Sequence, residues 1–229
     1  MQRLRVVFSR GEEIKFISHL DLMRCWERVL LRADIPVAYS EGFNPRPRMA
    51  LAAPLAVGVT SECELMDIYL ANALFPDTFR KQVMLQLPVG LMLGTVTDVP
   101  LGQPSLQALM RGIEYRVTIK SDFSRGEIEQ IIEKLLQAKH LPWQQTRGNV
   151  LVKYDLRPLL GNIWVIDREE SCCILGMHLC VTPRGTGRPE QVTRAMGITE
   201  FPLQIHRVRL ILNDIEAGKE EVPEEGVIE

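Results

Sequence analysis

The sequence predicts an α+β protein made of two tandem ferredoxin-like domains, each a βαββαβ unit with an antiparallel sheet. Its 229 residues suit two domains of about 100 residues each. Segments with period-two alternation and segments with helical apolar spacing follow one another twice in this order. Prolines and glycines gather between the two series, which is typical of a linker.

The first domain is expected to span residues 1–104. Ser18 and Asp21 fit a capping box at the start of a helix whose apolar stripe includes Trp26. This helix should end before Pro36, because a proline disfavours helical geometry in the residue before it. The elements expected here are strand 3–9, helix 18–34, strand 37–39 interrupted by GFNPRPR, extended segment 49–57, strand 64–70, helix 75–87 and strand 91–99.

The second domain is expected to span residues 105–213. It follows a linker, residues 99–112, that contains two prolines and two glycines. Residues 214–229 lack apolar periodicity and are expected to form an acidic, disordered tail. The elements expected in the second domain are short helix 105–110, strand 115–120, helix 124–138, strand 150–156 with a hairpin continuation at 159–166, strand 172–182, helix 189–196 and strand 206–212.

The composition is that of a soluble globular protein, with 46% hydrophobic and 24% charged residues. No apolar run reaches the ~18–20 residues that a membrane span needs. The charged first residues do not resemble a secretory signal. We therefore expect a cytoplasmic protein without a membrane partner, whose five cysteines are reduced and structural.

Charge is spread unevenly along the chain. The net charge is −2, but residues 214–229 hold seven acidic residues and one lysine. The remaining chain has 26 basic and 22 acidic residues, a net charge of +4. This mildly basic body is compatible with local contacts to RNA and gives no indication of DNA specificity.

The loop GFNPRPR, residues 42–48, contains the sharpest candidate site. Gly42 allows a positive φ and Asn44 a local turn, while two prolines stiffen the backbone on both sides of Arg46. Arginine suits bidentate contact with phosphate, and Phe43 offers a ring on which a base can stack. The alternative is a rigid structural turn, with Phe43 packed on the core and Arg46 and Arg48 solvated.

Three arginines, Arg24, Arg28 and Arg32, recur every four residues on the preceding helix. Such a stripe can follow a phosphate backbone. The alternative is a solvated helix face that Asp21 and Glu27 partly balance. The helix and loop arginines should form one basic patch on the first domain, and if they point to opposite faces the loop is a structural turn.

The second half carries further candidates for phosphate binding. Alternation places Lys153, Asp155 and Arg157 on one strand face, which predicts an ion-paired ladder. Arg184 and Arg188 surround two glycines at the start of a helix, where exposed amides can hold a phosphate. A simple loop entering the helix is the alternative, and no P-loop or GxGxxG spacing indicates nucleotide binding.

Catalytic and metal motifs are sparse. His19, in the first helical turn, is a candidate general acid or base without an accompanying second group, and a solvent-facing histidine without a role is the alternative. Cys172, His178 and Cys180 share one strand face and invite a zinc hypothesis, but no CxxC pair accompanies them. We expect no metal and no cofactor in this chain, which also lacks CxxxCxxC and GxSxG motifs.

The stretch FISHLDLMRCWERVLLRADIPVAYSEGFNPRPRMALAAPLAVGV resembles the signature of the radical-SAM-linked protein family, a bacterial domain found beside or fused to cobalamin-type radical SAM proteins. The resemblance continues through SECELMDIYL, DLRPLL and GRPEQVTRAMG to IHRVRLIL, near residue 212. Arg48, Met49 and Ala50 depart from it, because the family usually has a basic residue followed by Ser-Phe. The resemblance implies a radical SAM protein as partner. Genes of that family often lie near genes for RNase E/G and ribosomal proteins, so the resemblance also implies a role in RNA metabolism.

Three functions remain open at this stage. The first is a non-enzymatic RNA-binding accessory protein that presents tRNA or rRNA to a radical SAM partner. The second is a metal-independent RNA endonuclease with His19 as general base, by analogy with the tandem ferredoxin-like CRISPR RNA endonucleases. The third is a module that docks on the radical SAM subunit without RNA. The RNA contacts expected for the first function are Arg24, Arg28, Arg32, Phe43, Asn44, Arg46 and Arg48.

Overall fold

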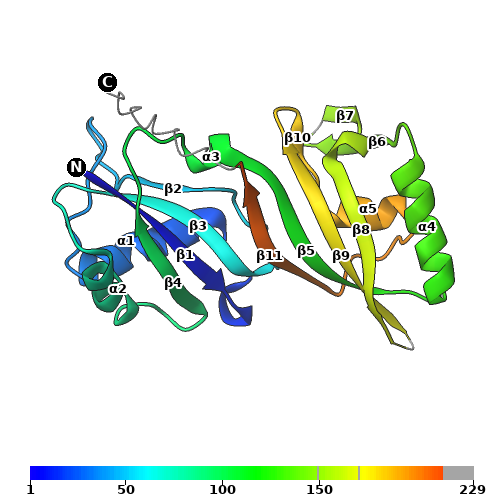
Figure 1. The fold of residues 1–229 in the computed structure, drawn as a ribbon, viewed down its shortest axis with the longest axis horizontal. Coiled ribbons are helices and arrows are strands. Elements are labelled where there is room, and N and C mark those ends of the chain that lie inside the picture. Colours follow the sequence, from blue (N-terminus) through cyan, green and yellow to red (C-terminus); the bar gives the residue numbers. More distant parts are fainter. Residues whose placement is uncertain (149, 170, 214–229) are drawn as a thin grey trace, which may run out of the picture.

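The protein is a mixed α+β structure built around one long sheet (Figure 1). A computed structural model describes residues 1–148, 150–169 and 171–213. The first half contains β1 (Gln2–Arg10), α1 (His19–Arg32), β2 (Met49–Leu51), β3 (Thr60–Leu70), α2 (Pro76–Met84) and β4 (Leu91–Asp98). The second half contains α3 (Leu106–Leu109), β5 (Met110–Lys120), α4 (Arg125–Gln137), β6 (Pro142–Arg147), β7 (Val150–Asp155), β8 (Leu160–Arg168), β9 (Cys172–Thr182), β10 (Gly185–Thr186), α5 (Pro189–Ala195) and β11 (Gln204–Leu212).

The main sheet has nine strands in the order β10-β9-β5-β11-β3-β1-β4, with β2 also paired to β3 and β8 to β9. Neighbouring strands are antiparallel except that β11 runs parallel to β3. This confirms the predicted α+β class with a mostly antiparallel sheet. Within the described residues, no helix is long and apolar enough to cross a membrane.

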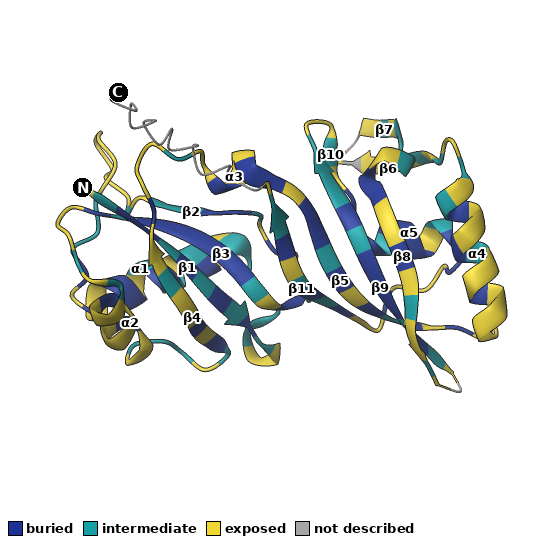
Figure 2. Cartoon of the chain, viewed as in Figure 1, coloured by how far each residue is buried: buried dark blue, intermediate teal, exposed yellow. Residues whose placement is uncertain are grey.

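In the first half the strands lie in the order β4-β1-β3-β2, and α1 and α2 pack on one face of the sheet. Ser18 caps α1 by accepting a hydrogen bond from the Asp21 amide at 3.2 Å, as the sequence predicts. Trp26 is fully buried and meets Phe8 edge to face, with ring centres 5.1 Å apart. Burial of such a side chain contributes about 1.5–3 kcal/mol, and it fixes α1 behind the sheet (Figure 2).

In the second half the strands lie in the order β11-β5-β9-β8, with α4 and α5 packed on the second apolar cluster. Ser124 and Glu127 form a reciprocal capping box at the start of α4. The second cluster also includes Ala52, Leu55 and Val59 from the first half. The two cores therefore do not divide where the linker does, and a boundary after residue 104 stays a prediction.

The expected strand 150–156 is not part of the main sheet. Its residues form β7, which pairs only with β6 in a separate two-stranded sheet, and β8 takes the position beside β9. The β6–β7 turn includes Gly148, whose φ of +58° suits glycine. The strand expected at 37–39 is likewise reduced to isolated bridges, because Pro45 and Pro47 lack the amide protons that a ladder needs.

A buried ion pair lies where the two halves meet. Arg207 on β11 donates to Glu64 on β3 at 2.9 Å, and both side chains are almost wholly buried. Arg207 also donates to the carbonyl oxygens of Ala53 and Pro54. The pair therefore ties β11, β3 and the segment after β2 together.

Candidate functional site

Residues 38–48, here called the arm, form a short hairpin that projects from the first half near the N-terminus (Figure 1). The Ser40 amide donates to the Arg46 carbonyl at 2.9 Å, and the Arg48 amide donates to the Ala38 carbonyl at 2.8 Å. The Arg46 amide donates to the Ser40 hydroxyl at 3.0 Å. These bonds close the base of the arm, while Gly42, at a φ of +121°, makes the turn at its tip.

The tip of the arm presents Phe43 to solvent. Its relative exposure is 106%, so the alternative in which Phe43 packs on the core is excluded. Asn44 and Arg46 are also exposed, and the Arg46 guanidinium has no hydrogen-bond or ion-pair partner in the part of the chain described. Glu41, two residues before Phe43, is also exposed. The tip therefore offers one aromatic ring and one uncommitted guanidinium.

Arg48, by contrast, is engaged with the body of the protein. Its guanidinium lies over the Tyr69 ring, 4.7 Å from the ring centre, and one of its nitrogens is 3.3 Å from the Met1 sulfur. The Tyr69 amide donates to the Arg48 carbonyl at 3.0 Å. Arg3 lies over the same ring at 5.8 Å. Arg48 thus attaches the base of the arm to β3.

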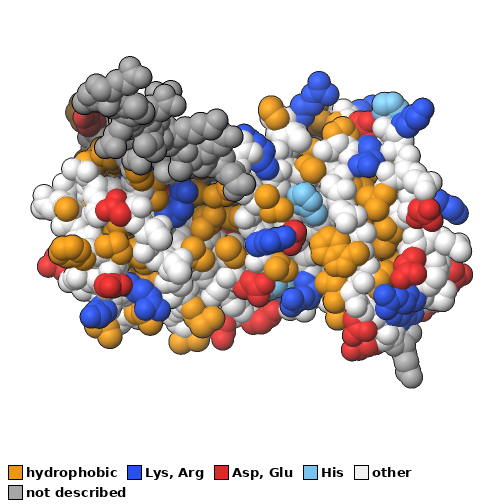
Figure 3. Space-filling model, in the orientation of Figure 1, with side chains coloured by type: hydrophobic (Ala, Val, Ile, Leu, Met, Phe, Trp, Pro, Cys, Tyr) orange, Lys and Arg blue, Asp and Glu red, His pale blue; other side chains and the backbone are white. Residues whose placement is uncertain are grey.

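The helix arginines lie on the other side of the sheet from the Arg48 guanidinium. Ile68 and Leu70 point into the apolar cluster on which α1 packs, so Tyr69 between them faces the opposite way. The predicted single basic patch therefore does not unite Arg48 with the α1 stripe. Where Figure 3 shows the face opposite α1 uncovered in the first half, Lys and Arg side chains do not form one continuous patch.

The three α1 arginines differ in their partners. Arg24 is exposed and pairs with Asp21 at 3.3 Å. Arg32 donates to the Gln86 carbonyl at 2.9 Å, which links the end of α1 to the segment after α2. Arg28 is exposed and has no hydrogen-bond or ion-pair partner among the described residues. Only Arg28 is therefore wholly available to a ligand.

His19 is half-buried at the first position of α1. Its Nδ1 is buried and has no hydrogen-bond partner among the residues described. No carboxylate or second histidine is bonded to it there. The geometry therefore supplies no orienting group of the kind that a general base normally has.

In the second half, Asp155 and Arg157 do not form the predicted ion-paired ladder. Asp155 pairs with His140 at 2.8 Å, and its pKa is lowered to about 2 mainly by backbone amides, that of Leu141 first. The Arg157 guanidinium donates to three carbonyl oxygens, those of Leu136, Ala138 and Leu160, at 2.7–3.1 Å. Arg157 thus caps the end of α4, and each of its three side-chain nitrogens donates to a carbonyl.

Lys153, Arg184 and Arg188 are exposed. Arg188 lies 4.0 Å from Glu190. Basic side chains gather at the upper right of Figure 3, over β10 and the β6–β7 hairpin.

The zinc hypothesis finds no support in the geometry. Among the described residues, no group of three or more His, Cys, Asp or Glu side chains is placed to hold a metal ion. The ring of His178 instead lies over Gly112 and Gly161 on the two neighbouring strands, where a β-carbon would overlap it. All five cysteines are free, and burial raises the pKa of the Cys25, Cys63 and Cys173 thiols.

Residues 3–189 of this chain match one protein family, which is described as "Uncharacterized protein conserved in bacteria (DUF2344)". The chain belongs to this family. A comparison with curated proteins found no match.

Three solved structures match this DUF2344 chain over most of its length, at low identity and with TM-scores below 0.5. A Cbf5–Nop10–Gar1 complex matches with 11% identity and a TM-score of 0.48, covering 91% of this chain and 48% of the other. The archaeal box H/ACA Nop10–Cbf5 complex has 9% identity and a TM-score of 0.46, with coverages of 92% and 48%. An H/ACA particle bound to a substrate RNA has 12% identity and a TM-score of 0.44, with coverages of 91% and 47%. This chain spans about half the length of these matches, and nothing about its function follows from them.

Sequence reasoning missed a hollow on the β6–β7 hairpin of this DUF2344 chain. It is lined by His140, Trp143, Lys153 and Asp155, among others. The signal available was HLPWQQTR, a polar segment with one tryptophan directly after a helix. Only the pairing of β6 with β7 brings it beside residues 153–155.

Proposed function

We propose that this chain is a non-enzymatic RNA-binding protein that contacts RNA through the tip of the arm. The observation that carries the proposal is the full exposure of Phe43 beside the uncommitted Arg46 guanidinium. An exposed aromatic ring costs free energy in water, and stacking on an unpaired base removes that exposed surface. Arg46 would contact the adjacent phosphate, and Asn44 would hydrogen-bond a base edge.

The charge of the chain favours local contact over broad electrostatic attraction. The body to residue 213 has a net charge of only +4. A protein of this kind neutralises few phosphates, so its affinity for RNA should fall only modestly with salt. We therefore assign unpaired nucleotides in a loop or at an end of a structured RNA, such as tRNA or rRNA, as the target.

Further contacts would extend from the arm. Arg28 would form a second contact surface on α1. Arg24 and Arg32, which already have partners, would add their positive charge to it. In the second half Lys153, Arg184 and Arg188 remain candidates for phosphate contact. Arg48 and Arg157 are assigned to holding the arm and the end of α4 instead.

The architecture and the partner are also proposals. The strand orders β4-β1-β3-β2 and β11-β5-β9-β8, with α1 and α2 in the first half and α4 and α5 in the second, support an interpretation as two ferredoxin-like units. The sequence resemblance supports a radical SAM protein as the partner to which the RNA is presented. In this proposal the chain itself carries no cofactor, and the partner supplies the chemistry.

A gel-shift titration with total cellular RNA and purified tRNA tests the proposal. Phe43→Ala and Arg46→Ala should each weaken binding, by about 5-fold or more for loss of a stacked base. Matched controls are Phe201→Ala, an exposed phenylalanine before β11, and Arg125→Ala, an exposed arginine on α4, neither of which should change the affinity. Unchanged affinity in the Phe43→Ala/Arg46→Ala double variant would overturn the assignment of the arm.

Docking of the arm on a protein is the second candidate, because an exposed Phe43 is equally suited to a protein pocket. Co-purification of a radical SAM partner that survives nuclease treatment and is lost in Phe43→Ala would favour docking. The third function, RNA cleavage, predicts that a cleavage product forms in the presence of EDTA and is absent when the His19→Ala variant replaces the unaltered protein. Intact RNA after prolonged incubation with the unaltered protein would remove it.

A further inference from the structure

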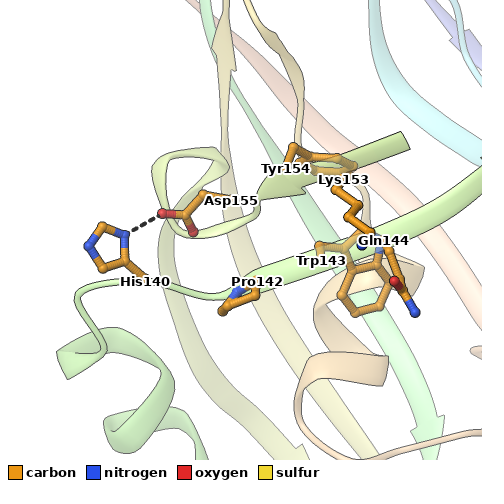
Figure 4. A pocket seen from close by; sticks show the side chains of 7 residues that line it. All are labelled: His140, Pro142, Trp143, Gln144, Lys153, Tyr154 and Asp155. Atoms are coloured by element: carbon orange, nitrogen blue, oxygen red, sulfur yellow. Dashed lines mark hydrogen bonds and ion pairs between the residues drawn. The ribbon is translucent and has the colours of Figure 1, made fainter. Parts of the chain in front are cut away.

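The β6–β7 hairpin contains a hollow of about 680 Å³ that the arm-based function does not use. The hairpin stands outside the nine-stranded sheet, at the opposite end of the molecule from the arm (Figure 1). His140, Trp143, Gln144, Lys153 and Asp155 are among its lining residues, and Figure 4 shows these side chains around it. Such a set of polar and aromatic groups is typical of a ligand site.

One side of the hollow is a fixed imidazole. His140 Nδ1 donates to Asp155 Oδ2 at 2.8 Å, and the carboxylate also accepts the amides of Leu141 and Arg157 at 2.8 and 2.9 Å. Since an ionised carboxylate only accepts hydrogen bonds, Nδ1 carries a proton, and Nε2 is left to donate to a phosphate oxygen in the doubly protonated ring. The three donors stabilise the ionised Asp155 carboxylate and occupy its oxygens, so that the carboxylate orients His140.

The other side combines a flat ring with a cation. Trp143 on β6 is half-buried, and its indole N–H is buried without an acceptor among the described residues. Trp143 therefore lines the hollow with the carbon atoms of its ring. Gln144 is paired in register with Lys153 on β7, so both side chains lie on one face of the hairpin, whereas Trp143, paired with Tyr154, lies on the other. Side chains of both faces line the hollow. Lys153 is exposed and carries a positive charge into the hollow.

This arrangement fits a ligand with a planar heteroaromatic ring and a phosphate. A ring stacks on indole, an amide such as Gln144 reads a base edge, and an ammonium group with an imidazole binds phosphate. We propose that the hollow binds one nucleotide unit, with its base against Trp143 and its phosphate between Lys153 and His140. The unit comes either from a free mononucleotide or from an RNA chain.

Heteronuclear NMR of the tryptophan indole signals tests this proposal. The Trp143 signal is identified with Trp143→Phe, and the protein is titrated with AMP, CMP, GMP and UMP in turn and with a single-stranded hexaribonucleotide. Saturable shifts at Trp143 with any mononucleotide indicate the free ligand, and shifts with the hexaribonucleotide alone indicate RNA. Either result supports the proposal. No saturable shift at Trp143 with any of these probes overturns it.

Variants separate a nucleotide site from a fortuitous contact. Lys153→Gln and His140→Ala should each weaken the titrated affinity by about 3- to 10-fold. Lys134→Gln on α4 and Trp164→Phe on β8 are exposed controls that should leave it unchanged. Equal affinity in the parent and in Lys153→Gln would overturn the phosphate assignment, provided that both proteins melt at the same temperature.

The nucleotide titration at Trp143 tests a site that is separate from the arm. Arg46→Ala should weaken RNA binding at the arm and leave the mononucleotide titration at Trp143 unchanged. If RNA occupies both places, each group of variants should weaken it separately, because two linked contacts raise the overall affinity. Failure of the arm variants therefore leaves this site standing, and failure of the Trp143 titration leaves the arm standing.

Discussion

The guanidinium of Arg48 lies 4.7 Å from the centre of the Tyr69 ring, and the two residues are also joined by a backbone hydrogen bond of 3.0 Å. A cation above an aromatic face is attracted to the ring's negative electrostatic potential. Because Tyr69 belongs to β3 and Arg48 ends the arm, this contact fixes the direction in which the arm leaves the sheet. We therefore expect Arg48, which the sequence predicts to bind phosphate, to position the arm instead.

Arg48→Ala should loosen the arm and weaken RNA binding indirectly. Loss of an exposed cation–π contact is worth about 0.5–1 kcal/mol, so we expect the affinity to fall about 2- to 5-fold. Hydrogen exchange at the Ser40, Arg46 and Arg48 amides should become faster, and Tyr69→Leu should reproduce this. If Arg48→Ala abolishes binding while these amides stay protected, Arg48 contacts the RNA directly.

A substitution of Glu41 tests whether the ligand of the arm is anionic, as RNA is. Its carboxylate is exposed at the tip of the arm, close in sequence to Phe43 and Arg46. Glu41→Gln should raise RNA affinity by about 2- to 5-fold at low salt, because an opposing charge in water is worth about 1 kcal/mol. Fluorescence anisotropy over a range of salt concentrations measures this, and the gain should shrink as salt rises. Weaker RNA binding in Glu41→Gln would contradict the proposed approach of phosphate.

Local signals predicted the elements that depend on neighbouring residues. Ser18 caps its helix as the sequence pattern indicates, and the structure adds a cap at Ser124. The sequence leaves two interpretations of Phe43, exposed or packed on the core, because it does not show whether an aromatic ring in a proline-rich turn contacts the core. The structure excludes one of them.

Features set by distant pairing were not predicted. Residues 150–156 alternate like a sheet strand, yet β7 pairs with β6, because the position beside β9 is taken by β8. Arg157 and Arg48 looked like surface cations since their partners, the end of α4 and Tyr69, are 19 or more residues away. Charge alone does not reveal whether a guanidinium meets a carbonyl, a ring or solvent.

The Arg207–Glu64 pair predicts a strongly asymmetric response to mutation. Arg207→Met leaves the Glu64 carboxylate buried without its partner and the carbonyls of Ala53 and Pro54 without their donor, which should cost about 3–5 kcal/mol of unfolding free energy. Arg207→Met combined with Glu64→Leu should recover part of this loss. Urea unfolding of the parent, both single variants and the double variant measures the coupling. Additive losses in the double variant would contradict the pairing.

The same pair predicts a pH dependence. Burial raises the pKa of the Glu64 carboxyl although Arg207 opposes the shift. For a carboxyl whose folded pKa is raised, stability is fully present below the unfolded pKa and is lost as pH rises through the folded pKa. Arg207→Met removes the opposing cation, so its destabilisation should grow with pH above about 4.3, the ordinary value for glutamate. Equal losses in acid and at neutral pH would argue against a buried carboxylate.

The Asp155 carboxyl predicts a pH dependence of stability with the opposite sign. Its pKa is lowered to about 2 by the Leu141 amide, His140 and the Arg157 amide, in that order. A carboxyl with a depressed folded pKa stabilises the protein above its unfolded pKa, and this contribution is lost as pH falls through the folded value. Asp155→Asn should therefore lower the melting temperature at neutral pH and reduce the decline in melting temperature between about pH 4 and pH 2. An unchanged acid profile would contradict this role.

Arg157 provides a test of capping against charge. Its guanidinium donates to the carbonyl oxygens of Leu136, Ala138 and Leu160, and Leu136 lies in the last turn of α4. Arg157→Met keeps the aliphatic stem and removes all three bonds, which should cost about 1–3 kcal/mol. Arg157→Lys retains the charge but cannot reach three separated acceptors with a planar fork, so it should recover less than half of the loss. Chemical unfolding measures both variants, with RNA affinity as a second readout. If Arg157→Lys restores stability in full, charge near the helix end, not geometry, is what matters; if Arg157→Met lowers RNA affinity without lowering stability, Arg157 belongs to the binding surface after all.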